Sequence, residues 1–497
     1  MAAAAAHVLV FPFPLQGHIN CMLPFATALA GAGILVTFLH SDHNIRRLGH
    51  ASAPPSPRLR FLSIPDGLPD NDPRSVGGLL ELVKSLQVVA SAAFRALLAS
   101  LLSTTNPSRA DHHDGADAAD SDGGFPSVTC VVADGYLPWA IDVADELGVP
   151  VLAFRTSSAC SILAFLSAPR LFELKELPFP AGGDLDEPVR GVPGMESFLR
   201  RRDLPSSFRR AGEHGVNPRL PVLVKDTFHS GKARALIFNT AASLERSALA
   251  HIAPHMRDVF AVGPLHAMFP APAAVATSLW REDDRCVAWL DGQADKSVVY
   301  VSLGSLAVMS HEQFTEFLSG LVAAGHPFLW VLRPDMVGES RDGDATTPQD
   351  AIRAAAGDGK AHVVAWAPQR DVLRHRAVGC FLTHAGWNST LEAVVEGVPM
   401  LCWPFFADQQ INSRFVGAVW RNGLDMKDVC ERGVVEKTVR EAMESDEIRQ
   451  SAEALAEQVK RDIADGGSSA MELKRLVSFI RELSSTSTAE NDLQIQE

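Results

Sequence analysis

The amino-acid sequence predicts an α/β protein made of two doubly wound domains, and three features of the chain support this prediction. With 497 residues, of which 46% are hydrophobic and 21% charged, the chain is globular and too long for one hydrophobic core. Short apolar runs alternate with amphipathic stretches, as in parallel sheets covered by helices. A Pro- and Ala-rich break at 266–278 separates two similar halves, which indicates an interdomain linker.

Charge and cysteine content argue against several kinds of partner. The formal net charge is −14 and there is no long run of Lys and Arg, so nucleic acid and anionic membranes are not expected as partners. The seven cysteines include no CxxC pair, which favours a reducing compartment, here the cytoplasm, and no metal site. We therefore expect a cytoplasmic monomer whose partners are small molecules.

The first strand is expected at 8–13, an apolar run that follows an alanine-rich start without the basic residues of a signal peptide. The apolar residues 21–39 have the length of a membrane span. However, Pro24, Gly31 and Gly33 divide them into a helix, a turn and a second strand. No membrane partner is expected from this region.

Two candidate catalytic residues follow strands in the first half. His18 lies between the strand at 8–13 and a helix, and Asp134 ends a strand at 128–133. The carboxyl ends of parallel strands share one sheet edge, where ligands bind. A helix N-terminus disfavours an imidazolium ion, so His18 would be neutral and able to accept a proton, while Asp134 would fix its tautomer. Taken alone, a turn His or a helix-capping Asp is more often an ordinary polar residue.

Other polar clusters are better explained as solvated acids. The low-complexity segment 107–124 contains His112 and His113, and a solvated loop is a better explanation for it than a metal site. The DxD triplets at 184–186 and 342–344 resemble a metal-binding motif, but both lie in Pro- and Gly-rich loops, and solvated acids are the better interpretation. The chain has no P-loop, no GxSxG elbow and no HExxH motif, and Ala30 to Gly33 is not a complete dinucleotide-binding fingerprint.

The second half begins a new sheet with strands at 297–303 and 327–332. A further strand at 378–382 leads into a helix, in which Ser389 and Thr390 are expected to bind the free backbone N–H groups and Gly397 to end the helix. Such a helix start suits a diphosphate. At the end of the chain, 448–483 has the apolar spacing of an amphipathic surface helix.

The segment 366–409 spans 44 residues without a gap and reads WAPQRDVLRHRAVGCFLTHAGWNSTLEAVVEGVPMLCWPFFADQ. It resembles the 44-residue nucleotide-sugar signature of the plant family 1 UDP-dependent glycosyltransferases. In addition, QGHIN at 16–20, AD at 133–134 and DVADELG at 142–148 resemble the segments that carry this family's general base and its partner. The resemblance thus covers motifs in both halves of the chain.

The resemblance implies a GT-B-like fold, in which two Rossmann-type domains face a central cleft. The acceptor would bind to 1–265, a linker would occupy 266–280, and the UDP-sugar would bind to 281–460. A C-terminal helix at about 461–485 is expected to pack back on the first domain.

The resemblance also assigns a role to individual residues. His18 would be the general base and Asp134 its partner. Trp366 would stack on uracil, with the Ala367 backbone at the edge of the base. The residues expected at the ribose are Gln369 and Glu392; at the diphosphate, His384, Asn388, Ser389 and Ser305; and at the sugar, Trp387, Asp408, Gln409 and Thr156. Gln409 favours glucose over galactose, and Arg155 departs from the family, whose members usually carry an aromatic residue there.

The expected reaction is inverting, metal-independent transfer of glucose from UDP-glucose, with no other cofactor. The acceptor would be a hydroxyl or carboxyl group of a plant secondary metabolite or hormone, such as a flavonoid or isoflavone, a terpenoid or iridoid, or a phenolic. The segment 194–205 resembles the branch that includes iridoid glucosyltransferases, and the pocket is expected near 12–15, 85–89, Leu137 and 195–199. The alternatives are another donor (UDP-galactose, UDP-xylose or UDP-glucuronate) or a nucleotide-sugar binding protein without turnover.

Overall fold

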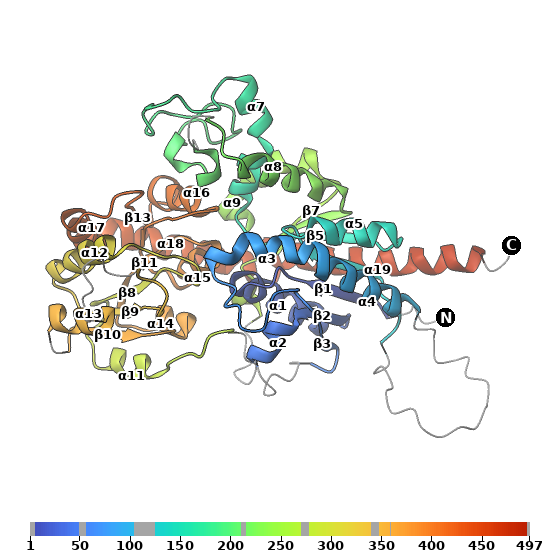
Figure 1. The fold of residues 1–497 in the computed structure, drawn as a ribbon, viewed down its shortest axis with the longest axis horizontal. Helices are drawn as coiled ribbons and strands as arrows, with labels where there is room; N and C mark the ends of the chain where they lie inside the picture. The colour runs from blue at the N-terminus through green and yellow to red at the C-terminus, as the bar shows by residue number, and fades with distance from the viewer. Residues whose placement is uncertain are drawn as a thin grey trace.

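The computed structural model of the chain describes residues 5–48, 56–103, 125–209, 215–269, 278–338, 347–357 and 359–494. The segment with His112 and His113, the triplet at 342–344 and most of the expected linker lie outside these residues. Within them, the chain forms two parallel sheets, each covered by helices (Figure 1). The predicted α/β class with two doubly wound sheets is confirmed.

The first sheet has seven parallel strands in the order β3-β2-β1-β4-β5-β6-β7. The order reverses between β1 and β4, which pair directly, with Phe11 opposite Ala133. This reversal is the topological switch point, where open parallel sheets bind ligands. The strands are β1 His7–Phe11, β2 Leu35–Ser41, β3 Leu59–Ile64, β4 Cys130–Asp134, β5 Val151–Arg155, β6 Ala235–Phe238 and β7 Val259–Ala261.

Helices cover both faces of this sheet because its strands are apolar on both sides. Along β1, Leu9 and Phe11 face one core cluster while Val8 and Val10 face the other, as the two-residue period of a strand requires. The helices are α1 Gln16–Gly31, α2 Asp42–Leu48, α3 Leu79–Ser85, α4 Ser91–Ser103, α5 Pro138–Glu146, α6 Ala159–Leu166, α7 Ala168–Glu173, α8 Arg219–His229, α9 Ala242–Ile252 and α10 Leu265–Met268.

The second sheet repeats the same winding with six parallel strands in the order β10-β9-β8-β11-β12-β13. Its switch point lies between β8 and β11. The strands are β8 Val298–Ser302, β9 Phe328–Val331, β10 Ala361–Val364, β11 Val378–Thr383, β12 Met400–Cys402 and β13 Gly423–Asp425. The helices are α11 Arg285–Asp291, α12 His311–Ala324, α13 Pro348–Ala356, α14 Gln369–Arg374, α15 Trp387–Glu396, α16 Gln409–Arg414, α17 Arg432–Glu444, α18 Asp446–Ile463 and α19 Ser468–Gln494.

The single helix predicted at 448–483 is in fact two helices, α18 and α19. They are separated by a turn in which Gly467 packs so closely that a Cβ atom there would lie 2.2 Å from the Arg461 carbonyl oxygen. After the turn, Leu476 and Ile480 of α19 are buried in the core cluster that also contains α1 residues. Figure 1 shows α19 running beside the first sheet.

Two further features of the first domain differ from simple sequence expectations. Pro24 lies inside α1 and does not end it, because the neighbouring Leu23 and Phe25 are buried in the core. One helical segment of the described chain, Leu79–Ser103, is long and apolar enough to cross a membrane, with a mean hydropathy of 1.6. It consists of α3, a π-helical turn η2 (Leu86–Ala90) and α4, and it buries Phe94 and Leu98 in the first domain.

Candidate active site

His18 and Asp134 meet at the switch point of the first sheet. His18 lies in the first turn of α1, and Asp134 is the last residue of β4. The distance from His18 Nδ1 to Asp134 Oδ2 is 2.6 Å, and the Asp134 side chain is fully buried whereas that of His18 is 19% exposed. The predicted pair is therefore brought together, with the carboxylate behind the imidazole.

Hydrogen bonds fix the orientation of this pair. The Asp134 carboxylate also accepts the backbone N–H groups of Phe13, at 3.2 Å, and Tyr136, at 3.0 Å. Because a carboxylate can only accept, Nδ1 of His18 carries the proton. Nε2 is then the basic nitrogen, and it has no hydrogen-bond partner among the residues that the structure describes. The rings of Phe13 and Tyr136 pack against the imidazole at centroid distances of 5.2 and 5.4 Å.

Thr156 and Arg155 lie next to this pair. The hydroxyl oxygen of Thr156 is 3.1 Å from His18 Nδ1, which places the residue at the His–Asp pair itself. Arg155 is buried and bonds to the Ser230 hydroxyl at 2.6 Å and to a backbone carbonyl of α8 at 3.1 Å. A Cβ atom at Gly135 would lie 2.5 Å from Arg155 Nε. The guanidinium therefore occupies space that only a glycine after Asp134 leaves open.

The helix start at the second switch point has no side-chain cap. α15 begins at Trp387 with Gly386 in the N-cap position. The expected capping by Ser389 and Thr390 is wrong: the Ser389 hydroxyl accepts from Gln369 at 3.0 Å, and the buried Thr390 hydroxyl has no partner in the described structure. The first backbone N–H groups of α15 therefore remain for a ligand. Gly397 ends the helix in the left-handed region, as predicted.

His384 is enclosed between two glycines on the adjoining loops. A Cβ atom at Gly304 would lie 2.6 Å from the imidazole, and one at Gly386 would lie 2.4 Å from its Nε2. Burial, together with the charge of Arg333, lowers the pKa of His384 to about 4, so the ring is neutral near pH 7. Arg333 also donates to the Ala307 carbonyl at 2.8 Å and holds the loop on which the half-buried Ser305 lies.

The side chains expected at the base and the ribose are also close to one another. Gln369 donates to Glu392 at 2.7 Å and accepts from Tyr300 at 3.3 Å, and burial raises the pKa of Glu392. The half-buried Trp366 precedes the buried Ala367. Its indole ring is stacked on that of Trp280, with centroids 5.5 Å apart and an interplanar angle of 19°.

Three residues of the second domain are expected at the sugar, and all three are buried beside the first domain. Asp408 accepts the backbone N–H of Ser158 at 3.2 Å, and burial raises its pKa. The Gln409 carbonyl oxygen accepts two backbone N–H groups of its own loop, at 2.8 and 2.9 Å, so its amide N–H₂ group is the part left for a ligand. The Trp387 indole N–H donates to the Asn239 carbonyl at 2.8 Å, so the ring points toward the first domain.

Two residues that the sequence interpretation did not identify belong to this arrangement. Arg333 lies two residues after the end of β9, at the carboxyl edge of the second sheet, so the positional rule that identified Asp134 would have found it. Trp280 comes from the linker, and no local sequence pattern there indicates that it stacks on Trp366.

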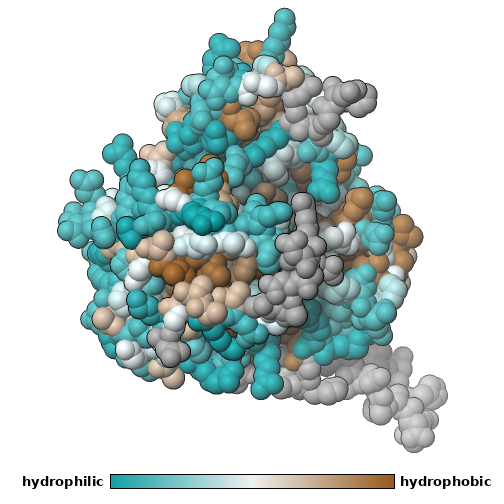
Figure 2. Space-filling model, turned by 60° about the vertical axis from the view of Figure 1, so that its left-hand side comes forward, coloured by the Kyte–Doolittle hydropathy of each residue, from teal (hydrophilic) through white to brown (hydrophobic). Residues whose placement is uncertain are grey.

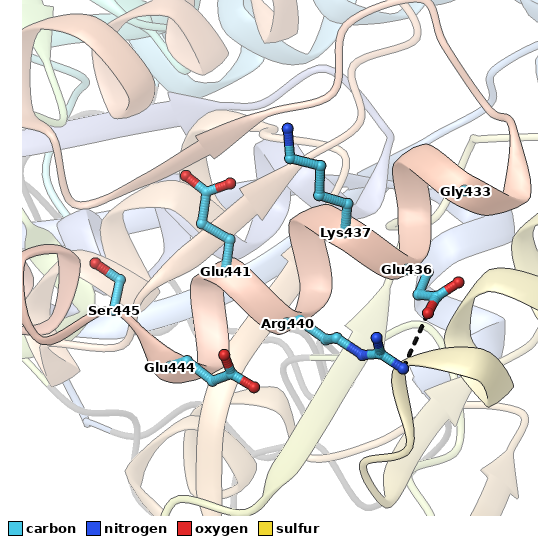
Figure 3. Close-up of a pocket in the computed structure, with 7 residues that line it drawn as sticks. All are labelled: Gly433, Glu436, Lys437, Arg440, Glu441, Glu444 and Ser445. Carbon is cyan, nitrogen blue, oxygen red and sulfur yellow. Dashed lines mark ion pairs between the residues drawn. The ribbon is translucent and has the colours of Figure 1, made fainter.

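A surface hollow on α17 is unrelated to these residues. Figure 3 shows it lined by one side of the helix, with an ion pair between Glu436 and Arg440 at 2.9 Å. In the described part of the chain, no three His, Cys, Asp or Glu side chains are grouped as a metal site. Asp186 instead pairs with Arg200 and Arg202 at 2.8 and 2.7 Å.

Comparisons with known proteins give a consistent result. The profile of the family "UDP-glucoronosyl and UDP-glucosyl transferase" matches residues 256–457. The chain is 43% identical to a myricetin 3-O-rhamnoside 1,2-glucosyltransferase of Crocosmia x crocosmiiflora, over 97% of each chain. It is 41% identical to a 7-deoxyloganetic acid glucosyltransferase of Catharanthus roseus, over 96% of this chain and 98% of the relative. Os79 from O. sativa in complex with UDP is similar in structure, with a TM-score of 0.74, 28% identity, and coverage of 95% of this chain and 100% of the other.

Proposed function

The chain belongs to the plant UDP-dependent glycosyltransferases, and from the arrangement around His18 we propose that it transfers glucose from UDP-glucose to a small plant metabolite with inversion at the anomeric carbon. The family, its GT-B fold and its activity as a UDP-glycosyltransferase were predicted from the sequence and are confirmed. We assign the acceptor to 1–265, the UDP-sugar to 281–460 and the linker to 266–280.

One observation carries the proposal: His18 Nδ1 is bonded to the buried Asp134, which leaves Nε2 as the base. As the acceptor oxygen attacks the anomeric carbon from the face opposite UDP, Nε2 takes the hydroxyl proton. The bond between the anomeric carbon and the UDP oxygen breaks, and UDP leaves with the electron pair. Asp134 offsets the charge of the imidazolium ion. A carboxyl acceptor is already ionised near pH 7 and needs no proton transfer.

The uncapped start of α15 supports departure of UDP without a metal ion. Negative charge develops on the diphosphate as the bond breaks, and free backbone N–H groups at a helix start stabilise it. The neutral His384 offers one more N–H donor. Asn388 and Ser389 lie in the first turn of α15, and Ser305 lies on the loop that Arg333 holds. We propose that the reaction needs no other cofactor.

The donor is assigned to the remaining predicted side chains of the second domain, together with Thr156 of the first. We propose that Trp366 stacks on uracil beside the Ala367 backbone, and that Gln369 and Glu392 bind the ribose. The sugar would contact Asp408, Gln409, Trp387 and Thr156. The Gln409 amide and the Asp408 carboxylate together offer donors and acceptors for the hydroxyl groups of glucose. UDP-galactose, UDP-xylose and UDP-glucuronate are the alternative donors.

An apolar acceptor is supported by exposed apolar side chains of the first domain. The segment from α3 to η2 exposes Leu80, Val83, Val88 and Val89, which are between 37% and 72% exposed. Buried residues of the same segment share a core cluster with Phe13, whose ring contacts His18. A flavonoid, terpenoid, iridoid or phenolic acceptor fits these exposed apolar side chains. On the face that Figure 2 draws, hydrophobic residues likewise form groups among hydrophilic ones.

The test measures UDP release from UDP-glucose with a panel of flavonoid, terpenoid, phenolic and carboxylic-acid acceptors. Wild type and His18→Ala are compared, and the masses of the products are measured by mass spectrometry. Release of UDP that depends on a hydroxyl acceptor and that the variant loses, with a hexose on the product, supports the proposal. Binding of UDP-glucose without acceptor-dependent release would favour a non-catalytic binding protein. We place the reaction in the cytoplasm, in keeping with seven free cysteine thiols.

A further inference from the structure

The end of the linker lies across both domains at the place assigned to the uracil base. Trp280 is stacked on Trp366 of the second domain, as described above. The guanidinium carbon of Arg47, on α2 of the first domain, lies over the Trp280 ring at 5.1 Å from its centroid. Arg47, Trp280 and Trp366 thus form one continuous stack whose members come from the first domain, the linker and the second domain.

Hydrogen bonds donated by backbone N–H groups hold the chain on either side of Trp280. The Leu279 N–H donates to the side-chain oxygen of Gln16 at 2.6 Å. Gln16 begins α1, two residues before His18, and its amide nitrogen donates to Asn20 at 2.6 Å. On the other side, the Asp283 N–H donates to the Trp366 carbonyl at 2.9 Å. A short segment therefore connects the helix of the candidate base to the residue assigned to uracil.

Ordinary packing of a linker aromatic is the alternative explanation, and the chain contains a direct comparison. Trp289 on α11 is stacked on His362 at the same centroid distance and angle, 5.5 Å and 19°. That stack lies within the second domain, and no hydrogen bond or ring contact joins it to a proposed donor residue in the described structure. Trp280 differs because its partner is the residue assigned to uracil, and the half-buried ring of Trp366 needs support if a base is to stack on it.

We propose that Trp280 and Arg47 are positioning residues for the donor nucleotide. They hold the Trp366 ring in place for the uracil, and the bond between Leu279 and Gln16 links occupation of the base site to the start of α1. The guanidinium strengthens the stack by its attraction to the indole π face. This inference rests on the proposed function, in which Trp366 stacks on uracil.

The test measures UDP binding by calorimetry and the KM values for UDP-glucose and for the acceptor. The variants are Trp280→Ala, Trp280→Phe, Arg47→Met and the matched control Trp289→Ala, each checked for its Tm. Trp280→Ala is expected to weaken UDP binding about fivefold, the effect of losing one aromatic pair. The KM for UDP-glucose rises in parallel and the KM for the acceptor stays unchanged. Trp280→Phe and Arg47→Met give smaller losses, and Trp289→Ala leaves UDP binding at the wild-type value.

Unchanged UDP affinity in Trp280→Ala would overturn the inference, as would a loss equal to that of Trp289→Ala. Tighter UDP binding in Trp280→Ala would also overturn it, because Trp280 would then occupy the position of the base. If Trp280→Ala fails to fold, Trp280→Phe and Arg47→Met carry the test. Trp366→Ala separates the two proposals: wild-type UDP affinity in that variant would contradict the proposed base site itself, whatever the Trp280 variants show.

Discussion

The side-chain amide of Asn388 donates a hydrogen bond of 2.5 Å to the backbone carbonyl of Gly17, 371 residues away in sequence. Asn388 lies in the first turn of α15 and Gly17 in the first turn of α1, and these helices are in contact (Figure 1). Because His18 follows Gly17, the bond sets the proposed base directly against the proposed diphosphate site.

Replacing Asn388 by Leu should therefore lower kcat/KM. The loss of one such bond, and of a diphosphate contact, corresponds to about 1.4 kcal/mol or more, which is at least about tenfold. Gly17→Ala is the control, since it keeps the carbonyl and its Cβ atom would lie 3.7 Å from the Asn388 amide, an ordinary contact. Steady-state rates of UDP release would measure both variants, and equal rates for Asn388→Leu and wild type would contradict the role of this bond.

Asp134→Asn should reduce kcat by roughly 10³ to 10⁴, as in other His–Asp pairs, because an amide donor opposite Nδ1 favours the wrong tautomer of His18. UDP affinity should be unaffected, since Asp134 belongs to the first sheet. Single-turnover product formation is the measurement, with UDP calorimetry as the control. A variant within tenfold of wild type would show that Asp134 does not orient the base.

Gly386→Ala should displace the His384 imidazole and weaken UDP binding by roughly tenfold, because a Cβ atom would lie 2.4 Å from Nε2 and overpacking costs about 1 to 3 kcal/mol. Gly433→Ala on α17, where a Cβ atom would meet nothing within 4 Å, is the matched control. Calorimetry of UDP binding compares the two. Wild-type affinity in Gly386→Ala would mean that His384 plays no part in holding the diphosphate.

The buried His40 on β2 should make stability depend on pH. Burial lowers its pKa from 6.5 to about 4, and both ring nitrogens lack a hydrogen-bond partner in the described structure. The unfolded chain therefore takes up this proton at a higher pH than the folded chain does, and stability falls as the pH drops from 6.5 to about 4.

His40→Leu should remove this pH-dependent loss of stability, which amounts to roughly 3 kcal/mol between pH 6.5 and about 4. Denaturant unfolding of wild type and His40→Leu at pH 7 and pH 4.5 measures the difference. The variant should lose less stability than wild type between these two values. An equal loss in both proteins would show that His40 is already protonated in the folded state or remains neutral in the unfolded one.

The sequence by itself determined the local units of this protein. Strand, turn and helix follow one another within a few residues, so apolar runs and Gly or Pro breaks indicated the two α/β halves and the strand ends that carry His18 and Asp134. The uninterrupted segment 366–409 indicated the family, because its residues are contiguous. These signals depend only on neighbours in the chain.

Tertiary structure alone decided several of the contacts between side chains. Ser389 has the local position of a helix cap, yet its hydroxyl bonds to Gln369, which arrives from another helix. The break between α18 and α19 reflects close packing at Gly467, and the apolar spacing of 448–483 continues across it. The contacts of Trp280 with Trp366 and of Asn388 with Gly17 join segments far apart in sequence. They depend on how the two domains are placed against each other, and local periodicity contains no information about that placement.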